Sequence, residues 1–428
     1  MPQKLEISPE LKNLAKRIES SQDNFFIAGK AGTGKSTLIK YLRQHSKKNT
    51  VILAPTGVAS VNVEGQTIHS FCGLPLSYIN KDAIHEHRDK TLYRNLDTLI
   101  IDEISMVRAD VFDGMDHFFR INRLDKSLPF GGVQVILVGD LYQLAPVVET
   151  GLAEVFSKKY SSPYFFSAEA FSRSRHLFKF IELDKIYRQS DEEFIKMLHE
   201  VRVGKVSPET IKLFNERMVL EEEPDDSFII LTSRNDAANK INQKRLSEID
   251  AKEKTYTAEV WGEFNEKSYP TEFELKLKPG AKVMLLKNDM KGRWVNGSLG
   301  YVSEIESDFI TVDVDGKAYQ IEKAVWQKIK YVFSEKTNRV EEEVIGTFTQ
   351  YPLRLAWAVT IHKSQSMTFD KVVIDLGQGA FSHGQTYVAL SRCRTLDGIY
   401  LKRPIRMSDF IFDKVVVGFY SVFEDKIH

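Results

Sequence analysis

One stretch of the chain has the residue types and spacing of a phosphate-binding loop. Residues 29–36 read Gly-Lys-Ala-Gly-Thr-Gly-Lys-Ser and fit the pattern G-x-x-x-x-G-K-S/T without a mismatch. In such a loop, backbone N–H groups surround a phosphate, the lysine bridges the β- and γ-phosphates, and the serine hydroxyl contacts Mg²⁺. The sequence therefore predicts a nucleoside triphosphate site. The residues expected to bind the nucleotide are Gly29, Ala31, Gly32, Thr33, Gly34, Lys35, Ser36 and Thr37.

Two adjacent carboxylates and one amide follow later apolar runs. Asp102 and Glu103 end the run at 99–101, and Gln143 follows the run at 133–138. Asp102 is suited to hold Mg²⁺ together with Ser36, and Glu103 to polarise the water that attacks the γ-phosphorus. Gln143 could hydrogen-bond the γ-phosphate. Without the phosphate loop, the acidic pair would read equally well as helix caps or salt-bridge partners, and Gln143 as part of an ordinary capped loop.

The elements that must position these groups are short, apolar and regularly spaced. Runs at 25–28, 51–54, 98–101 and 133–138 alternate with helical stretches, as in a parallel sheet that is buried on both faces. Further runs at 228–231, 353–360, 372–376 and 399–401 predict a second such sheet. The fold class is therefore α/β, with two doubly wound lobes and the phosphate loop at the carboxyl end of its strand.

The segment between about 256 and 345 has a different pattern. Short alternating runs at 281–286, 300–304, 309–314 and 317–322 are separated by turn residues such as Asp315 and Gly316. This pattern predicts a small antiparallel β-barrel inserted in the second lobe. Within it, residues 276–293 form a basic strip next to Trp294, which could bind single-stranded nucleic acid or could equally be a solvated face over a core tryptophan.

Composition limits the other classes. The 428 residues include 59 Lys and Arg and 59 Asp and Glu, so the formal net charge is zero. We therefore expect a polyanion to be bound by local basic patches and not by a surface that is basic overall. Two distant cysteines, Cys72 and Cys393, argue against a zinc array or a disulfide framework. The first residues do not resemble a signal peptide, and no run reaches a membrane-spanning length. We expect a soluble cytoplasmic protein without a membrane partner.

Several further segments resemble the superfamily 1B DNA helicases, in particular the bacterial Pif-type family. The resemblance covers nearly the whole chain, and its motifs stand in the family's order. These motifs are residues 54–59 (APTGVA), 65–71 (GQTIHSF), 129–134 (PFGGVQ), 139–140 (GD), 187–189 (YRQ), 231–235 (LTSRN), 296–297 (NG), 360–365 (TIHKSQ) and 387–392 (YVALSR).

The resemblance implies two RecA-like lobes. It places residues 1–180 in the first lobe, with a small pin or wedge insertion at about 65–90, and 181–255 plus 346–428 in the second. Residues 256–345 form the inserted barrel, similar to a Src-homology-3 fold. Arg188 and Arg392 match motifs that bring arginines to the nucleotide, and both are expected in the second lobe, facing the γ-phosphate across a cleft. A structural arginine paired with carboxylates is the alternative for each.

The activity that the resemblance implies is ATP- and Mg²⁺-dependent movement, 5′ to 3′, on single-stranded DNA. Its expected substrates are duplexes, single-strand/duplex junctions and G-quadruplexes, in repair, recombination or telomere-type maintenance in a prokaryotic or phage-infected cell, by a monomer that can dimerise on DNA. Phe71, Leu74 and Pro75 form a predicted duplex-splitting pin. The residues expected to bind DNA are Thr56, His69, Ser70, Phe71, Thr232, Asn235, Asn296, His362 and Lys363.

The chain departs from the family pattern at two places. The glutamine that usually reads adenine ahead of the phosphate loop is absent from residues 11–16, and Ser366 stands where a glycine is typical. The acidic segment 221–226 reads as a solvated turn. Two alternatives stay open: an ATP-gated clamp that binds single-stranded DNA without unwinding it, and a metabolic kinase with the same phosphate loop.

Overall fold

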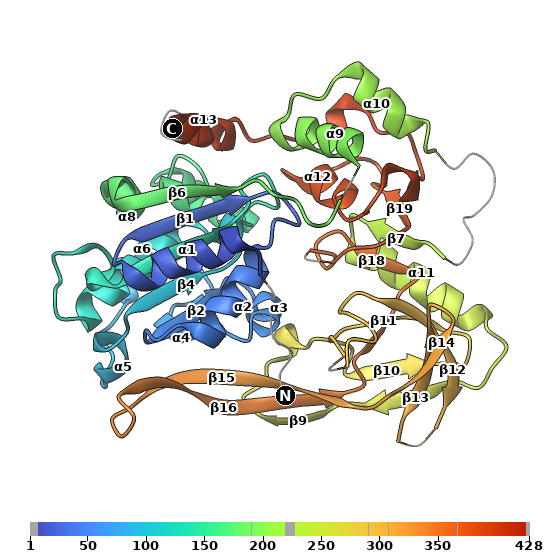
Figure 1. The fold of residues 1–428 in the computed structure, drawn as a ribbon, viewed down its shortest axis with the longest axis horizontal. Coiled ribbons are helices and arrows are strands. Elements are labelled where there is room, and N and C mark those ends of the chain that lie inside the picture. Colours follow the sequence, from blue (N-terminus) through green and yellow to red (C-terminus); the bar gives the residue numbers. More distant parts are fainter. Residues whose placement is uncertain are drawn as a thin grey trace.

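The computed structural model describes residues 7–189, 191–218, 227–289, 291–306, 308–365 and 367–424. The predicted turn at 221–226 and the departure at Ser366 lie outside these ranges. Figure 1 shows two α/β lobes and a separate body of β-strands. The prediction of a mixed α/β fold with two RecA-like parallel sheets is confirmed.

The first lobe is built on a six-stranded, all-parallel sheet. Its strands, in spatial order, are β3 (Gln66–Thr67), β2 (Thr50–Ala54), β4 (Thr98–Ile101), β5 (Gln134–Gly139), β1 (Asn24–Gly29) and β6 (Phe178–Leu183). Alternate strand residues face opposite layers: Ile27 packs with α1 (Pro9–Ser20) and α2 (Lys35–His45), and Phe26 with α6 (Ala109–Asn122). This two-sided burial explains why the strands read as continuous apolar runs.

Shorter helices complete this lobe. They are α3 (Gly57–Asn62), α4 (Ile68–Cys72), α5 (Thr91–Arg94), α7 (Ala153–Ser157) and α8 (Glu169–Ser174). The predicted boundary at residue 180 falls inside β6, because Leu183 still pairs with Gly29 of β1. The first lobe therefore extends beyond the predicted boundary.

The second lobe has a four-stranded parallel sheet. In spatial order its strands are β18 (Ala358–Thr360), β7 (Ile229–Thr232), β19 (Val372–Asp375) and β20 (Ile399–Leu401). Its helices are α9 (Glu192–Val203), α10 (Pro208–Asn215), α11 (Asn235–Glu248) and α12 (Gln385–Leu390). The predicted strand at 353–360 is wrong in part, since only its second half, β18, belongs to this sheet.

The first half of that segment, β17 (Leu353–Leu355), pairs antiparallel with the inserted β-structure. The five strands of this sheet, in order, are β14 (Lys317–Ile321), β13 (Ile310–Val314), β12 (Leu299–Ile305), β11 (Lys282–Leu285) and β17. A two-stranded sheet of β10 (Glu274–Leu277) and β8 (Lys254–Thr257) lies beside it, and the two share one apolar core.

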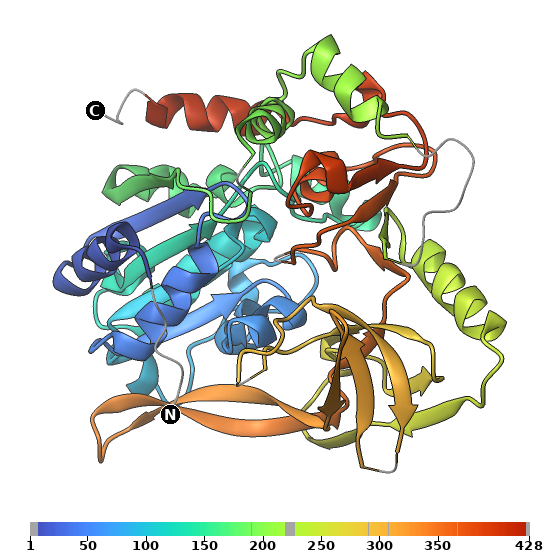
Figure 2. The same ribbon diagram turned by 45° about the vertical axis from the view of Figure 1, so that its right-hand side comes forward.

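A long hairpin, which the sequence pattern did not reveal, joins this insertion to the first lobe. It consists of β15 (Ala324–Ser334) and β16 (Arg339–Gln350), with β9 (Glu259–Gly262) along β16. Figure 2 shows it running beneath the first lobe. The Tyr331 hydroxyl accepts a hydrogen bond from Ile52 N at 3.3 Å, and Asn49 Oδ1 accepts one from Val340 N at 3.0 Å. The hairpin therefore spans the predicted boundary at 345/346.

The last described helix, α13 (Lys414–Glu424), returns to the first lobe, although the sequence placed it in the second. Figure 1 shows it beside β6. The Phe419 ring stacks on Phe166 at 4.3 Å, and the Tyr420 ring on Tyr142 at 4.9 Å. Within the described ranges, no helix combines the length and apolar character that a membrane crossing requires.

Candidate active site and nucleic-acid interface

The phosphate loop joins the end of β1 to the start of α2. Gly32 and Gly34 have φ angles of +83° and +89°, a left-handed backbone that glycine adopts without strain. A Cβ at Gly32 would lie 2.5 Å from Arg188 Cβ, so this position also lacks room for a side chain. Lys35 Nζ donates to Gly29 O at 2.7 Å and to Lys30 O at 2.9 Å. The lysine ammonium is therefore held inside the loop.

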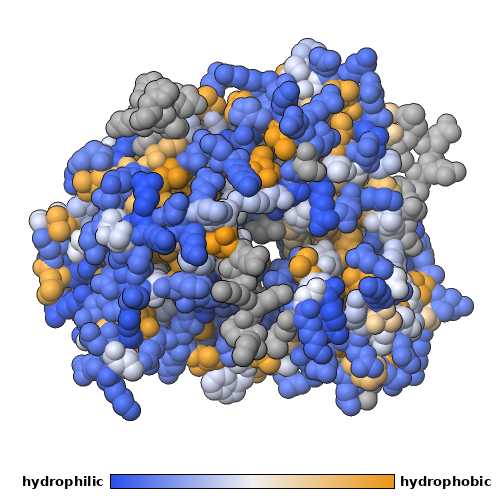
Figure 3. All heavy atoms as spheres, viewed as in Figure 1, coloured by the Kyte–Doolittle hydropathy of each residue, from blue (hydrophilic) through white to orange (hydrophobic). Residues whose placement is uncertain are grey.

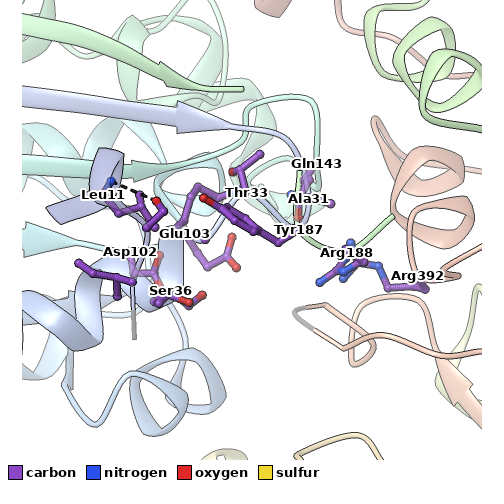
Figure 4. A pocket seen from close by; sticks show the side chains of 16 residues that line it. Leu11, Ala31, Thr33, Ser36, Asp102, Glu103, Gln143, Tyr187, Arg188 and Arg392 are labelled. Carbon is purple, nitrogen blue, oxygen red and sulfur yellow. Dashed lines mark hydrogen bonds between the residues drawn. The ribbon is translucent and has the colours of Figure 1, made fainter. Parts of the chain in front are cut away.

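The loop forms one wall of a cavity of about 410 Å³. The structure brings to this cavity the predicted loop residues from Ala31 to Thr37 and the five groups that later segments supply, Asp102, Glu103, Gln143, Arg188 and Arg392. Figure 4 shows the two arginines on the side opposite Ser36, Asp102 and Glu103. Gly29 does not line the cavity; its carbonyl instead holds Lys35. The cavity is also lined by residues 7, 8, 11 and 187, which were not predicted from the sequence to bind the nucleotide.

Asp102 and Glu103 follow β4 directly, so they reach the cavity from the centre of the sheet. Burial, with the neighbouring Glu103 charge, raises the pKa of Asp102 to about 7, and burial also raises the pKa of Glu103. Glu103 has a φ of +49°, which is strained for a side-chain-bearing residue and typical of functional sites.

A cation in this corner would relieve the cost of burying the carboxylates. Asp102 and the Ser36 hydroxyl both line the cavity, and hydroxyl and carboxylate oxygens are ligands that Mg²⁺ accepts. The described residues contain no group of three or more His, Cys, Asp or Glu side chains placed to hold a metal. The donor set therefore fits an ion that takes its other ligands from phosphate and water, as Mg²⁺ does in nucleotide sites.

Arg188 occupies a different place from the one predicted. It follows β6 of the first sheet and packs against the phosphate loop, where its Nη1 donates to Ser391 O of the second lobe at 3.2 Å. The prediction that Arg188 reaches the nucleotide from the second lobe is therefore wrong: it lies on the segment that connects the lobes. Burial lowers the pKa of Arg188 to about 10.

Arg392 does come from the second lobe, at the end of α12. It is 1% exposed, and its guanidinium donates to Val388 O at 2.9 Å and Ser391 Oγ at 2.9 Å, so its direction is fixed by its own helix. Burial, with the nearby Arg188 charge, lowers the pKa of Arg392 well below its usual value. Two cations that line one cavity favour a polyanionic ligand.

A buried ionic cluster, which the sequence did not predict, supports Gln143. Asp140 is 1% exposed; it accepts from Gln143 Nε2 at 3.2 Å and from Arg202 at 3.3 Å. Arg202 also donates to Glu182 at 3.0 Å and lies 4.6 Å from the Tyr142 ring centroid. Arg202 has no motif of its own, because it reads as one more basic residue of a surface helix.

The predicted DNA-binding residues of the first lobe lie at one edge of the sheet. Thr56 follows β2 and caps α3, and its side chain is exposed. Ser70, exposed, and His69, half-buried, belong to α4, which follows β3. β3 and β2 are neighbours at the edge of the sheet, so these residues lie near one another.

The second lobe repeats this arrangement. Asn235 begins α11 after β7, His362 and Lys363 follow β18, and all three are exposed. β7 and β18 pair as neighbours, with Thr232 opposite Thr360 at their carboxyl ends. Asn296, also exposed, lies in the loop that precedes β12.

Two predicted DNA residues are core residues. Phe71 is 5% exposed and packs against Tyr93 and Phe119, because α4 turns this ring into the first-lobe core. Thr232 is 1% exposed, and its hydroxyl donates to Arg234 O at 2.9 Å. Direct side-chain contact with DNA is therefore wrong for both in this conformation.

The prediction of an apolar pin also needs a correction. Leu74 is buried at 6%, whereas Pro75 is exposed and Leu76, which the sequence did not single out, is 71% exposed. The apolar tip of this insertion is therefore Pro75–Leu76.

The predicted basic strip is not a continuous binding surface. Lys282 is 1% exposed, with its ammonium on Phe228 O, and Arg293 pairs with Asp289 at 2.8 Å while covering the Trp294 ring at 4.5 Å. Trp294 packs on the barrel core, as the alternative proposed. Figure 3 shows a largely hydrophilic face with scattered hydrophobic areas and a hollow between the lobes and the barrel.

Comparisons with known proteins agree with this geometry. The sequence model of the PIF1-like helicase family matches residues 7–212. The ATP-dependent DNA helicase Pif1 of Bdellovibrio bacteriovorus is 36% identical over 98% of this chain and 93% of its own length. The human helicase PIF1 is 34% identical over 92% of this chain, which spans 60% of the human protein.

Solved structures of Pif1 from Bacteroides are also similar. The complex with ADP-AlF4 has a TM-score of 0.91 at 37% identity, covering 98% of this chain and 97% of that one. The complex with single-stranded DNA has a TM-score of 0.69 at 37% identity, covering 98% of both chains. The structure of two coordinating Pif1 helicases at forked DNA has a TM-score of 0.70 at 36% identity, covering 99% of this chain and 98% of that one. Unliganded Pif1 from Bacteroides has a TM-score of 0.89 at 38% identity, covering 98% of this chain and 97% of that one, so the present arrangement is nearer to the structures without DNA than to those with DNA. As the motifs predicted, the chain belongs to the PIF1-like helicase family.

Proposed function

We propose that this protein is an ATP-driven helicase that moves 5′ to 3′ along single-stranded DNA and separates duplex strands. The observation that carries the proposal is that Arg392 of the second lobe lines the same cavity as Lys35 and Glu103 of the first. A ligand that contacts both sides holds the lobes together, and its hydrolysis releases them. Family membership supports the helicase and ATPase activities, whereas polarity rests on the resemblance of the motifs.

Each cavity residue has a distinct role in this proposal. The loop N–H groups and Lys35 bind the phosphates, and Ser36 and Asp102 hold Mg²⁺, which neutralises phosphate charge when bound. Glu103 accepts the proton of the attacking water, while Gln143 contacts the γ-phosphate. Arg392, with Arg188 beside it, stabilises the charge that develops on the transferred group.

The DNA track runs over the edge strands of both sheets. Exposed hydroxyl, imidazole and ammonium groups at the ends of β2, β3, β7 and β18 are suited to sugar-phosphate contacts, which carry little sequence information. Pro75–Leu76 supplies the apolar tip at the point where strands separate. We extend this proposal to DNA-induced pairing of two copies, to unwinding of G-quadruplexes and to a role in DNA maintenance. We also propose a location in the reducing cytoplasm, which suits the two free buried cysteines.

The direct test compares two matched duplexes, one with a 5′ single-stranded tail and one with a 3′ tail, in the presence of ATP. We expect the wild type to open only the 5′-tailed substrate and Lys35→Ala to open neither. Opening of only the 3′-tailed duplex would contradict the polarity. DNA-stimulated hydrolysis without strand separation would favour the clamp, and hydrolysis unaffected by DNA would favour the kinase.

A second test addresses the apolar tip. Leu76→Asp should reduce unwinding while DNA-stimulated hydrolysis stays within about twofold, because the tip separates strands but does not touch the cavity. Leu124→Asp, at a leucine that is 81% exposed, is the matched control. Equal unwinding by both variants and the wild type would exclude a wedge role for Leu76.

A further inference from the structure

The loop 140–144, which carries Gln143, is enclosed by second-lobe groups. His383 Nε2 donates to Leu141 O at 2.9 Å, and its Nδ1 accepts from Asp413 N at 2.9 Å. A Cβ at Gly384 would lie 2.4 Å from Tyr142 O and 2.5 Å from Gln143 O. The start of α12 is therefore seated directly on the backbone of this first-lobe loop, without room for adjustment.

One residue of α12 extends from this contact to the phosphate loop. Tyr387 is 4% exposed; its hydroxyl accepts from Ala31 N at 3.2 Å and lies 3.4 Å from Asp140 Oδ2, to which it donates. A phenol has a single proton, so the amide must be the donor in the first bond and the carboxylate the acceptor in the second. The Tyr387 hydroxyl thus links the loops that follow β1 and β5.

The carboxylate oxygen that Tyr387 contacts is also the one that holds Gln143. Asp140 Oδ2 accepts from Gln143 Nε2, while Asp140 Oδ1 faces Arg202. Tyr387 and Gln143 therefore share one acceptor atom in a buried site, where hydrogen bonds to charged groups are strongest. Arg392, five residues after Tyr387, lines the cavity from the same segment.

We propose that Tyr387 is a positioning residue of the ATPase: its hydroxyl holds the phosphate loop, the Gln143 loop and the Arg392 segment in a single arrangement when the lobes meet. It acts through Ala31 N and Asp140 and does not touch the reacting atoms. The inference rests on the proposed ATPase function. It predicts that loss of one hydroxyl lowers turnover more than nucleotide affinity.

The test is Tyr387→Phe, which removes only the hydroxyl. Tyr351→Phe is the matched control, because Tyr351 is fully buried in the core of the inserted sheets and its hydroxyl has no hydrogen-bond partner among the residues that the structure describes. With saturating single-stranded DNA, Tyr387→Phe should lower kcat about tenfold or more, with KM for ATP within about threefold, since a buried hydrogen bond to a charged group supplies an effect of that order. Tyr351→Phe should keep the wild-type kcat.

A double-mutant cycle with Gln143→Ala separates positioning from a general structural effect. If Tyr387 acts by aligning Gln143 through Asp140, Tyr387→Phe should cost less in kcat when Gln143 is already absent. A kcat within twofold of the wild type for Tyr387→Phe, or equal fold losses in both backgrounds, would overturn the inference, as would a fall in melting temperature that accounts for the lost activity. Absence of hydrolysis in the wild type would instead contradict the proposed function itself.

Discussion

The centre and the edge of the first sheet hold their polar residues in different ways. At the centre, Asp102 and Arg392 line the cavity and are buried, and behind β5 the buried Asp140 carboxylate, which holds Gln143, pairs with Arg202. Behind β2 and β3, Thr56 and Ser70 are exposed: Thr56 caps α3, and Ser70 lies within α4. The second sheet repeats the exposed edge at β18 and β7.

The two arrangements suit two different kinds of contact. Phosphate chemistry needs fixed charges in a site that excludes water, so the chain itself assembles them. Binding to many DNA sequences needs contacts to the sugar-phosphate backbone that do not depend on the base, and exposed side chains at separate positions can supply such contacts one by one. Substitutions at the centre should therefore have large, coupled effects, and those at the edge small, additive ones.

The largest effect is expected from Arg392→Ala. Arg392 lines the cavity from the second lobe, and we propose that its guanidinium stabilises charge on the γ-phosphate. Its loss should therefore lower the DNA-stimulated kcat by about 10³-fold or more. Steady-state hydrolysis with saturating single-stranded DNA measures this, with Arg394→Ala as control, whose side chain is 56% exposed and pairs with Asp370. A loss below tenfold would assign Arg392 a structural role.

Arg202→Met should have the next largest effect, on stability. Arg202 is 4% exposed, and its removal leaves the Asp140 carboxylate buried without its cation, which costs about 3–5 kcal/mol. Urea unfolding measures the difference, and Arg394→Met at the surface should change stability by less than about 1 kcal/mol. If the two variants were equally stable, the buried cluster would not anchor the centre of the sheet.

Lys363→Ala tests whether the exposed residues after β18, at the edge of the second sheet, bind DNA. One lost phosphate contact should weaken single-stranded DNA binding several-fold and reduce the slope of log affinity against log salt by about 0.7, with kcat at saturating DNA nearly unchanged. Fluorescence anisotropy over a salt series measures this. Lys371→Ala, at the opposite end of the second sheet before β19, is the control; an identical result for both lysines would argue against an edge track.

The smallest effect is a pH dependence at the junction of the lobes. Burial lowers the pKa of His383 below its ordinary 6.5, so the neutral ring that bridges Leu141 and Asp413 is the favoured form. Its contribution to stability is complete above about pH 6.5 and is lost as the pH falls toward the lowered value. The difference in melting temperature between the wild type and His383→Gln should therefore shrink by about 1 °C when the pH falls from 7.5 to 5.5. A constant difference would contradict this.

Local patterns were enough to predict the parts of the site that one segment encodes. The phosphate loop and the Asp102–Glu103 pair each follow an apolar run, and parallel strands bring such ends together. Contacts between distant segments had no such signal: Tyr387 meets Ala31 across 356 positions, and Arg202 looks like an ordinary helix residue. Phe71 was misassigned because a motif position does not show which way a helix turns its side chains.

Larger elements were missed for the same reason. The hairpin β15–β16 was not predicted, and its docking against the first lobe depends on the Tyr331 hydroxyl and on Asn49, two single contacts that hydrophobic periodicity does not show. Helix α13 follows second-lobe strands in sequence, yet its aromatic face fits the first lobe. Sequence order alone could not assign either segment to its packing partner.

In the proposed function, a nucleotide that contacts both Arg392 and the phosphate loop holds the two lobes together, so it should also change how the edges of the two sheets bind DNA. The most direct measurement is the affinity of wild type and Arg392→Ala for one fluorescent single-stranded oligonucleotide without nucleotide, with ADP and with ADP-AlF4. We expect the wild-type affinity to change between these states and the change to be lost in Arg392→Ala. Wild-type affinity that is the same in all three states would contradict it.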